Sequence, residues 1–508
     1  MTAGLAAQPS YDLVVYGGTA GGVATAVAAA REGLKVALLE PGRRLGGMVS
    51  GGLGKTDHGN KETIGGLSLE FFKRLGRHYG EEITWYFEPH IAQQVFQEMV
   101  KEAGVSLFYQ HRLKEQGGVR KKGRQVREIV MENGARFRAR VFADATYEGD
   151  LMAQAGISYT WGREGSAQYR ESLAGVRPKD RNHMFEVRVP PYDSAGKLLS
   201  EIQPGPPGQL GAADKKVQAY NFRMCLSKDP ANQVAFPKPA DYDPKRYELL
   251  ARLISALTER DRKPPRMNQL MIVSPLPNNK VDINNYGAFS TDYIGKSWDY
   301  PTASYRRRAQ IWQDHTGYVA GFFYFLAHDP QVPRPLQEEI NRWGLARDEF
   351  TDTDHWPHQL YVREARRMVG DFVMTQKDIQ TELTKDDVIG MGSYNSDSHN
   401  VQRYVTEDGA VQNEGNMEVP VTPYQVPYRV MLPKRKECTN LLVPVCFSAS
   451  HVTYSTLRME PVYMIIGQAA GLAAKMALES RKPVQNIDTR ALTAKLRAQG
   501  AVMEWVKK

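Results

Sequence analysis

The first forty residues contain a strand, a glycine turn, a helix and a second strand in immediate succession. Residues 11–16 (YDLVVY) form a short apolar run that ends abruptly at Gly17, as a buried parallel strand does. An alanine-rich helical pattern follows over 23–32, and a second apolar strand over 34–39 ends at Glu40. One such βαβ unit is the context that a dinucleotide-binding fingerprint requires. The sequence therefore predicts an α/β protein with a Rossmann-type domain, the alternative being a glycine-rich turn in an unrelated α/β fold.

The residues of this turn suit the ADP half of a dinucleotide. Gly17 permits the sharp turn out of the strand, and Gly22 lets the helix pack closely on the sheet. The helix N-terminus then faces the pyrophosphate with free N–H groups. Glu40 is placed to accept hydrogen bonds from the ribose hydroxyls and to repel a 2′-phosphate, which disfavours NADP. Thr19 stands at the middle glycine position of G-x-G-x-x-G, and its hydroxyl is expected to donate to a phosphate oxygen.

A second glycine-rich loop follows Glu40 directly and favours FAD over NAD. NAD dehydrogenases do not need such a loop, whereas flavoproteins of the glutathione-reductase type run this part of the chain beside the extended FAD. The segment is similar to their E-x(3)-R-x-G-G pattern, in which Arg44 would neutralise phosphate charge with its two-pronged guanidinium. Gly46, Gly47 and Met48 are then predicted to lie along the cofactor.

Several longer stretches carry a more specific resemblance. A strand over 141–144 ends in the step Ala145-Thr146, which resembles the second FAD-binding loop of such proteins. Together with 361–370 (YVREARRMVG) and 448–471, these residues make the chain similar to the FAD-dependent oxidoreductase family, whose members are often labelled xanthan lyase-like. The resemblance implies a bound FAD and a glutathione-reductase-like fold.

The resemblance also implies that the C-terminal part of the chain returns to the cofactor. The segment 467–471 (GQAAG) would lie in a helix aimed at the flavin, which predicts cofactor contacts for Gly467, Gln468 and Gly471. Relatives in the wider class carry a Gly-Asp pair for the ribityl chain. This sequence has 446–450 (CFSAS) at that place, so Ser448 or Ser450 is expected to contact the ribityl chain or the pyrophosphate.

The predicted organisation is a discontinuous FAD-binding domain with an inserted mixed α+β substrate-binding or cap domain. The expected boundaries are 1–174 and 432–485 for the FAD domain, 175–431 for the cap, and 486–508 for a C-terminal helical extension. Within the first part, short strands are expected over 105–110, 125–131 and 136–142, as a small meander. Within the cap, 187–223 and 272–291 are expected to bear strands, and 301–327 and 336–367 to be mostly helical.

Two histidines are candidates for the base that a flavin dehydrogenase needs for the substrate's proton. His451 is the first candidate, because it lies between two family-like stretches that should flank the flavin. His399 is the second, with Asp397 placed to orient or charge it. For each histidine a purely structural role is an equally open alternative.

Substrate contacts are predicted for a further set of residues. Arg363 and Arg366 would share one face of a helix, where they would bind a carboxylate or phosphate or, as the favoured alternative, join the domains in a buried ion-pair network. Tyr286 and Asn395 lie in polar turns of the kind that line sugar sites. No spacing of His, Cys, Asp or Glu is typical of a metal site, so no metal is predicted.

Composition narrows the environment and the partners. The net charge of +9 would suit nucleic acid, but the basic residues are scattered, so a small-molecule substrate is favoured over nucleic acid. Three cysteines without close pairing fit the reducing cytoplasm, the alternative being export after loss of a signal of which residues 1–10 would be the remnant. No apolar run reaches the roughly 18 residues of a membrane span, so no membrane is expected. The oligomeric state stays open.

The predicted function is that of an FAD-dependent oxidoreductase acting on a small polar metabolite. It would oxidise an alcohol or amine carbon, for example in a sugar, by hydride transfer to flavin N5. The sequence has no second glycine fingerprint for NAD(P)H, so oxygen or an external acceptor would reoxidise the flavin. The alternatives are a flavin-dependent RNA-modifying enzyme and a non-redox flavin isomerase or lyase.

Overall fold

A seven-stranded sheet forms the centre of one half of the molecule, and β1 (Ser10–Tyr16) lies in its middle. The computed structural model describes residues 10–507, so the suggested signal remnant lies almost wholly outside the described residues. β1 pairs in parallel with β2 (Val36–Leu39) and with β6 (Arg136–Asp144). The late strand β20 (Leu441–Leu442) also pairs in parallel with β6. The sheet therefore confirms the α/β, Rossmann-type fold and joins the two ends of the chain.

The edge of this sheet differs from the predicted meander. β3 (Ser106–Phe108) pairs in parallel with β2, so it is an outer strand of the Rossmann sheet. The meander instead consists of β4 (Val119–Lys122), β5 (Gln125–Val130) and β6, which pair antiparallel. The sequence of β4, VRKK, is charged and largely exposed, so no hydrophobic alternation marks it as a strand.

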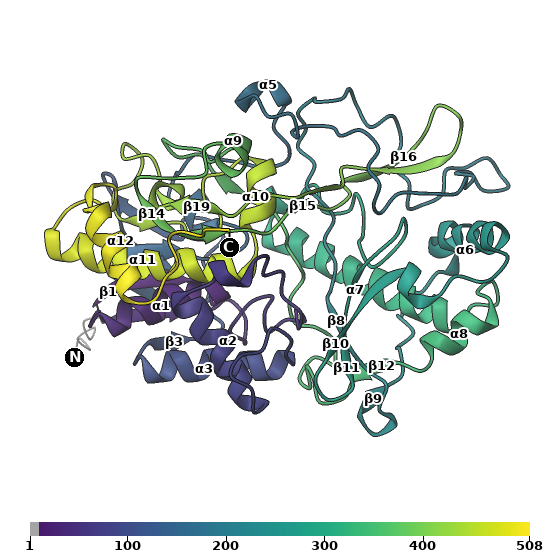
Figure 1. Ribbon diagram of the computed structural model, residues 1–508, viewed down its shortest axis with the longest axis horizontal. Helices are drawn as coiled ribbons and strands as arrows, with labels where there is room; N and C mark the ends of the chain where they lie inside the picture. The colour runs from purple at the N-terminus through teal and green to yellow at the C-terminus, as the bar shows by residue number, and fades with distance from the viewer. Residues whose placement is uncertain (1–9, 508) are drawn as a thin grey trace, which may run out of the picture.

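Helices from opposite ends of the chain pack together against this sheet (Figure 1). α1 (Ala20–Arg31) lies along α11 (Glu460–Ser480), and α2 (Gly66–His78) and α3 (Pro89–Glu102) lie beside them. A Cβ on Gly471 would lie 2.5 Å from the carbonyl oxygen of Thr25, so the two helices approach to a distance that only glycine allows. α11 is long and apolar enough to cross a membrane, but 89% of its apolar window is buried inside the protein, as in a core helix.

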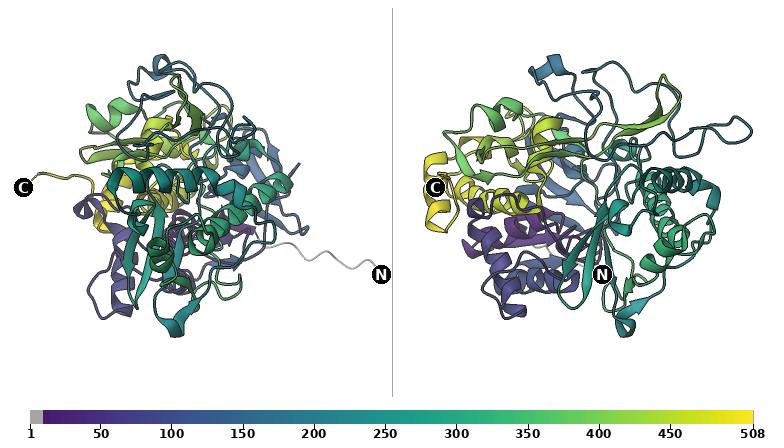
Figure 2. Two further views of the ribbon diagram at one scale, coloured as in Figure 1. Left: turned by 90° about the vertical axis from the view of Figure 1, so that its right-hand side faces the viewer. Right: turned by 45° about the vertical axis from the view of Figure 1, so that its right-hand side comes forward.

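The other half is built on a five-stranded antiparallel sheet. Its strands are, in spatial order, β10 (Met271–Leu276), β11 (Lys280–Asn285), β8 (Met224–Ser227), β12 (Gly344–Ala346) and β9 (Gln233–Val234). The helices of this half are α6 (Glu248–Asp261), α7 (Tyr305–His328) and α8 (Arg334–Ile340). In the right-hand view of Figure 2 these teal helices lie on the far side from the yellow C-terminal helices.

The chain returns to the first half before residue 432. β14 (Val388–Gly392) pairs with β19 (Tyr424–Pro427), and a Cβ on Gly390 would overlap the side chain of Ile465 on α11. Since β14 also packs against α12 (Thr489–Ala498), these two strands belong to the half that carries the Rossmann sheet. The predicted cap domain is therefore too long at its C-terminal end.

Two other predictions for the middle of the chain are wrong. The structure has no regular strand over 187–223, where single bridges such as Tyr192 with Leu198 replace a ladder. Of the predicted helix over 336–367, only the end of α8 is helical. Residues 361–366 form no helix and β13 (Arg367–Met368) follows them. The side chains of Arg363 and Arg367 are held by Asp292 and Glu164, which are far away in the sequence.

Candidate functional site

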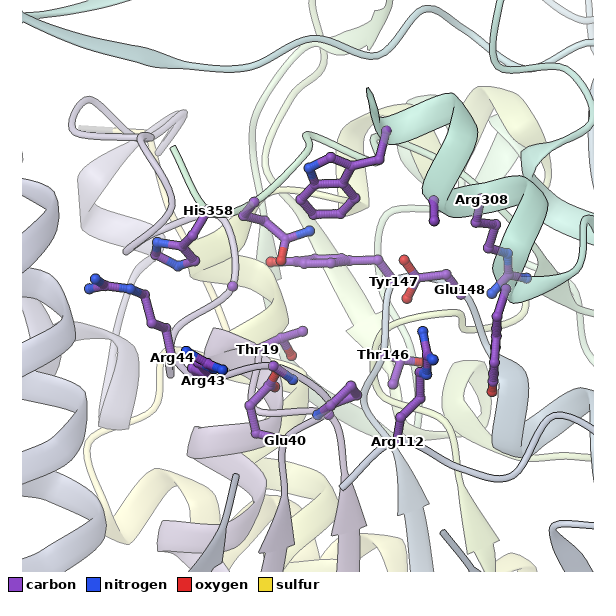
Figure 3. A pocket seen from close by; sticks show the side chains of 18 of the residues that line it. Thr19, Glu40, Arg43, Arg44, Arg112, Thr146, Tyr147, Glu148, Arg308 and His358 are labelled. Carbon is purple, nitrogen blue, oxygen red and sulfur yellow. The ribbon is translucent and has the colours of Figure 1, made fainter. Parts of the chain in front are cut away.

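A cavity of ≈ 820 Å³ opens between the two halves (Figure 3). The C-terminal ends of β1, β2 and β6 form one wall, as expected for the ligand crevice of an open parallel sheet. The opposite wall comes from α7 and from residues 352–359. Figure 3 shows Thr19 and Glu40 on the first wall, with Arg308 projecting from α7 and His358 from the second segment. Four arginines line this cavity: Arg43, Arg44, Arg112 and Arg308.

The glycine turn presents the N-terminus of α1 to this cavity. Gly17 has φ +105°, and a Cβ there would lie 2.7 Å from the carbonyl carbon of Ala145, so the position requires glycine. A Cβ on Gly22 would overlap the carbonyl oxygen of Gly17, which explains the glycine one turn into the helix. The backbone N–H groups at this helix end form the kind of site that holds a pyrophosphate.

Thr19 has a different role from the predicted one. Its hydroxyl donates to the Ala145 carbonyl at 2.7 Å and accepts from the Gly22 amide at 3.1 Å, so it caps α1. Because its proton is committed to Ala145, the hydroxyl is not a donor for a phosphate oxygen. In this structure the predicted donation to a phosphate oxygen therefore gives way to a helix cap, although Thr19 does line the cavity.

Glu40 lies at the end of β2, on the cavity wall. Its carboxylate accepts from the amides of Gly18 at 2.8 Å and Gly42 at 2.5 Å. Burial raises the pKa of this carboxyl to about 7, against the lowering effect of those two hydrogen bonds. The carboxylate therefore ties the end of β2 to the glycine turn and faces the place that a ribose would take.

The second glycine loop lies directly against the first. The Gly46 amide donates to the Gly18 carbonyl at 2.7 Å, and the Met48 amide donates to the Tyr147 hydroxyl at 3.0 Å. Gly47 lines the cavity, whereas Gly46 and Met48 are behind its wall. Arg44 lines the mouth, where its guanidinium donates to Asp352 across the cavity and to Gln93 at 2.9 Å.

Residues 144–147 complete the cofactor side of the cavity. Thr146 lines it, with its hydroxyl donating to Asp144 at 2.7 Å, while Ala145 is buried and supports Thr19. The Tyr147 hydroxyl donates to Glu460 Oε1 at 2.6 Å, at the first turn of α11. Burial raises the pKa of Glu460 to about 8. Tyr147 and Glu460 thus connect the cavity wall to α11, a pairing that no local sequence motif predicts.

Besides Gly22, Gly46, Met48 and Ala145, four residues of the C-terminal part that were predicted at the cofactor do not line the cavity. Gly467 and Gly471 lie in the middle of α11 and pack on α1, and Gln468 accepts from the Leu67 amide at 2.9 Å. Ser448 is buried between the Gly370 amide and the Phe372 carbonyl, at 3.0 and 2.6 Å. The GQAAG motif therefore serves helix packing, because its small residues let the two helices meet.

A family model describes almost the whole chain. The model of the FAD dependent oxidoreductase family matches residues 12–496. The chain belongs to the FAD-dependent oxidoreductase family. It is accordingly a flavoprotein enzyme whose cofactor is FAD. A search of curated protein sequences gives no match.

Solved structures resemble this flavoprotein only weakly. The Diels-Alderase PyrE3 of the pyrroindomycin pathway is 11% identical, with a match that covers 55% of this chain and 47% of that one at TM-score 0.26. OxyS anhydrotetracycline hydroxylase from Streptomyces rimosus is 10% identical over 55% of this chain and 46% of that one, also at TM-score 0.26. L-proline dehydrogenase from P. horikoshii is 15% identical, with a match that covers 37% of this chain and 63% of that one at TM-score 0.25. The chain thus spans less than half the length of the first two, and such likeness carries no information on substrate.

The residues of the cavity fit FAD. The α1 N-terminus with the turn 17–22 would hold the pyrophosphate, and Glu40 would accept from the ribose. His358 offers a further contact, since among the described residues neither of its buried ring nitrogens has a hydrogen-bond partner. Burial lowers the pKa of His358 to about 3, so the ring is neutral beside Arg44.

A group of buried arginines lies beside the end of the second glycine loop, next to the cavity. A Cβ on Gly51 would overlap Gln359, which lines the cavity, and a Cβ on Gly52 would overlap the backbone of Arg223. Two residues beyond Gln359, the centroid of the Tyr361 ring lies 4.7 Å from the buried guanidinium of Arg363 and 5.9 Å from that of Arg458. We call Arg223, Arg363 and Arg458 around Tyr361 the arginine cluster.

The two candidate histidines differ in how their nitrogens are engaged. His451 is occupied on both sides, by Glu364 at Nδ1 (2.8 Å) and Ser398 at Nε2 (3.2 Å), and burial lowers its pKa to about 3. His399 has Asp292 at Nδ1 (2.7 Å), but its Nε2 is 3.8 Å from the nearest carboxylate oxygen, on Asp397. Asp292 also pairs with Arg363 at 3.0 Å, which brings His399 to the arginine cluster.

The remaining predicted substrate residues lie apart from this group. Arg366 pairs with Asp150 at 2.6 Å and donates to the Glu148 carbonyl, so its guanidinium belongs to a buried ion-pair network in which Arg308 of α7 pairs with the same carboxylate. Tyr286 is 44% exposed and Asn395 is exposed. In Asp292 the structure adds a partner of His399 that no local motif marks, because the two residues are distant in the sequence.

One group of potential metal ligands is found among the described residues. Atoms of Glu88, His90 and Glu349 lie within 4.8 Å of one another. The ammonium of Lys280 already contacts both carboxylates, at 2.7 and 2.9 Å, and thereby balances their charge. This group is therefore an ion-pair cluster built around Lys280.

Proposed function

We propose that this FAD-dependent oxidoreductase oxidises a small polar molecule at an alcohol or amine carbon. FAD supplies the acceptor for the hydride and its two electrons, which then pass to oxygen or to an external acceptor. The observation that carries the proposal is the open Nε2 of His399, buried beside the arginine cluster, of which Arg223 lies against Gly52 of the glycine loop.

The surroundings of His399 suit the acceptance of a proton. Its Nδ1–H donates to Asp292 at 2.7 Å, which leaves the Nε2 lone pair for the O–H or N–H proton of the substrate. Burial, together with the positive charge of Arg363, lowers the pKa of His399. The imidazole is therefore neutral near pH 7 and ready to take up a proton, while Asp292 stabilises the imidazolium that forms.

An anaerobic mixing experiment tests this function. The holoenzyme is mixed with a panel of amino acids, hydroxy acids and sugars, and flavin absorbance is followed near about 450 nm. Bleaching by one substrate, with recovery when oxygen or a dye acceptor is added, supports the proposal. Conversion of a substrate without bleaching, and without need of an acceptor, would favour the non-redox alternative.

The His399→Asn variant then tests the base. It should slow bleaching by about 100-fold or more at neutral pH, since general-base catalysis contributes roughly 10²–10⁴-fold. His328→Asn, at the exposed end of α7, is the matched control and should leave bleaching unchanged. If His451→Asn slows bleaching while His399→Asn does not, the base is His451 and this assignment fails.

A further inference from the structure

Four guanidinium nitrogens of the arginine cluster have no hydrogen-bond partner among the described residues. They are Nη1 of Arg223, Nε and Nη2 of Arg363, and Nε of Arg458. The three residues are only 3%, 1% and 2% exposed, so solvent does not satisfy these donors. An unpaired buried donor destabilises the protein, and more so on a charged group, so four such donors in one cluster indicate that a ligand binds there.

The acids around the cluster are already engaged. Both carboxylate oxygens of Asp282 accept hydrogen bonds from Arg223, at 2.9 and 2.5 Å. The carboxylate of Asp292 pairs with both Arg363 and His399. Asp57 accepts from the Tyr394 hydroxyl at 3.1 Å. These carboxylates balance much of the positive charge, so recognition here depends on the directed N–H groups and not on a general positive field.

Arg458 has no carboxylate oxygen within hydrogen-bonding distance. Its Nη1 donates to the Tyr361 hydroxyl at 3.1 Å and its Nη2 to the Asp397 carbonyl at 2.7 Å. The nearest carboxylate oxygen, on Asp397, is 3.6 Å away. Arg363 has one carboxylate partner, and its pKa is lowered by burial, which is the sign of a charge that its neighbours do not fully offset.

We propose that the arginine cluster is the substrate subsite and that it binds a carboxylate. A carboxylate carries two acceptor oxygens in one plane and matches the forked donors of a guanidinium, so it can satisfy several of the four nitrogens at once. The inference rests on the proposed function. It narrows the substrate to a small acid whose oxidisable alcohol or amine carbon lies near His399, as in a hydroxy acid or an amino acid.

A titration that requires no turnover tests the subsite. The FAD-loaded protein is titrated with acetate and benzoate, and in parallel with acetamide and benzamide, which have the same shapes without the charge. We expect the carboxylates to give a saturable change in the visible flavin spectrum, and the amides to bind at least about tenfold more weakly.

Variants then assign the effect to the cluster. Arg458→Gln and Arg363→Gln should each weaken carboxylate binding by about tenfold or more, with FAD still bound. Arg458→Lys should bind carboxylates more tightly than Arg458→Gln but more weakly than the wild type, since an ammonium group lacks the two parallel N–H donors of a guanidinium. Arg403→Gln is the matched control, because Arg403 is equally buried but each of its nitrogens has a partner: Asn413, Glu201 and Ala288.

Several results would overturn the subsite. They are equal binding of the amides, no spectral change with either acid, and equal weakening in Arg403→Gln. Loss of FAD from the Arg458 and Arg363 variants would show that these donors serve the cofactor. A substrate that bleaches the flavin but carries no acidic group would end this inference and leave the proposed function standing. Carboxylate binding without bleaching by any substrate would support the subsite and contradict the proposed function.

Discussion

Gly467 on α11 lies so close to Gly21 on α1 that a Cβ at residue 467 would overlap the Gly21 carbonyl oxygen. α1 is the helix whose N-terminus faces the cofactor cavity, so its position depends on this contact. Close packing of α11 is therefore part of the phosphate site, although α11 contributes none of these glycines to the cavity wall.

Gly467→Ala should destabilise the protein by about 1–3 kcal/mol and weaken FAD binding, because the added methyl group pushes α1 and α11 apart. Urea unfolding and FAD dissociation measure the two effects. Gly317→Ala on α7 is the control, since a Cβ there meets nothing nearer than 3.4 Å and alanine favours a helix. Equal losses in both variants would contradict the packing role.

Removal of the Thr19 hydroxyl should lower the stability of the folded protein more than it lowers the affinity for FAD. Thr19→Val removes the cap of α1 and the bond to Ala145, which should lower the stability of FAD-free protein by about 1 kcal/mol. Thr19→Ser keeps the hydroxyl and should stay within about 0.5 kcal/mol of the wild type. If Thr19→Val instead weakens FAD binding with unchanged stability, the hydroxyl serves the phosphate after all.

FAD affinity should depend on pH through Glu40. The pKa of its carboxyl is raised to about 7 in the FAD-free protein, and the ionised form is the better acceptor for ribose hydroxyls. Affinity should therefore rise as the pH increases from 5 to 8 and then level off. Fluorescence titration with FAD measures it. Glu40→Gln should bind FAD more weakly at pH 8 and show no such rise, and a parallel rise in this variant would exclude Glu40 as the cause.

Glu460 should make stability fall as pH rises. Below its ordinary pKa of 4.5 both folded and unfolded chains hold the proton, and between 4.5 and about 8 only the folded chain keeps it. The free energy of unfolding should then drop by about 1.4 kcal/mol per pH unit from this group, and no further above pH 8. The stabilisation of Glu460→Gln relative to wild type should accordingly grow between pH 5 and 8.

Urea midpoints at pH 5, 7 and 8.5 measure this difference. The same substitution at Glu338, which is exposed on α8, serves as the control and should give a difference that does not change with pH. A constant difference for Glu460→Gln as well would mean that its carboxyl ionises normally in the folded protein.

The Rossmann unit was predictable because its signals are local. The strand over 11–16, the turn glycines and Glu40 lie within one supersecondary unit. In this unit a single steric or electrostatic requirement explains the residue type at each of these positions. The GQAAG motif was predictable as a small-residue helix segment. Its partner was not, because a run of small residues permits close approach without specifying to what.

The arginine-rich segment shows where local pattern fails. Residues 361–367 have helical spacing, but Arg363 pairs with Asp292 and Arg367 with Glu164, which the fold brings from other parts of the chain. These ion pairs favour a non-helical backbone against its local preference. Asp292 was missed as the partner of His399 for the same reason, since no motif joins the two in sequence.

The pairing of β20 with β6 sets an order for biosynthesis. Leu441 lies beside Phe142 in the sheet, so nearly all of the chain must leave the ribosome before this strand can be added. At about 5–20 residues per second, the nascent sheet and the apolar face of α1 wait tens of seconds for β20 and α11. During that interval the unfinished Rossmann half is a surface for chaperones to cover, and truncation before residue 441 would leave it permanently exposed.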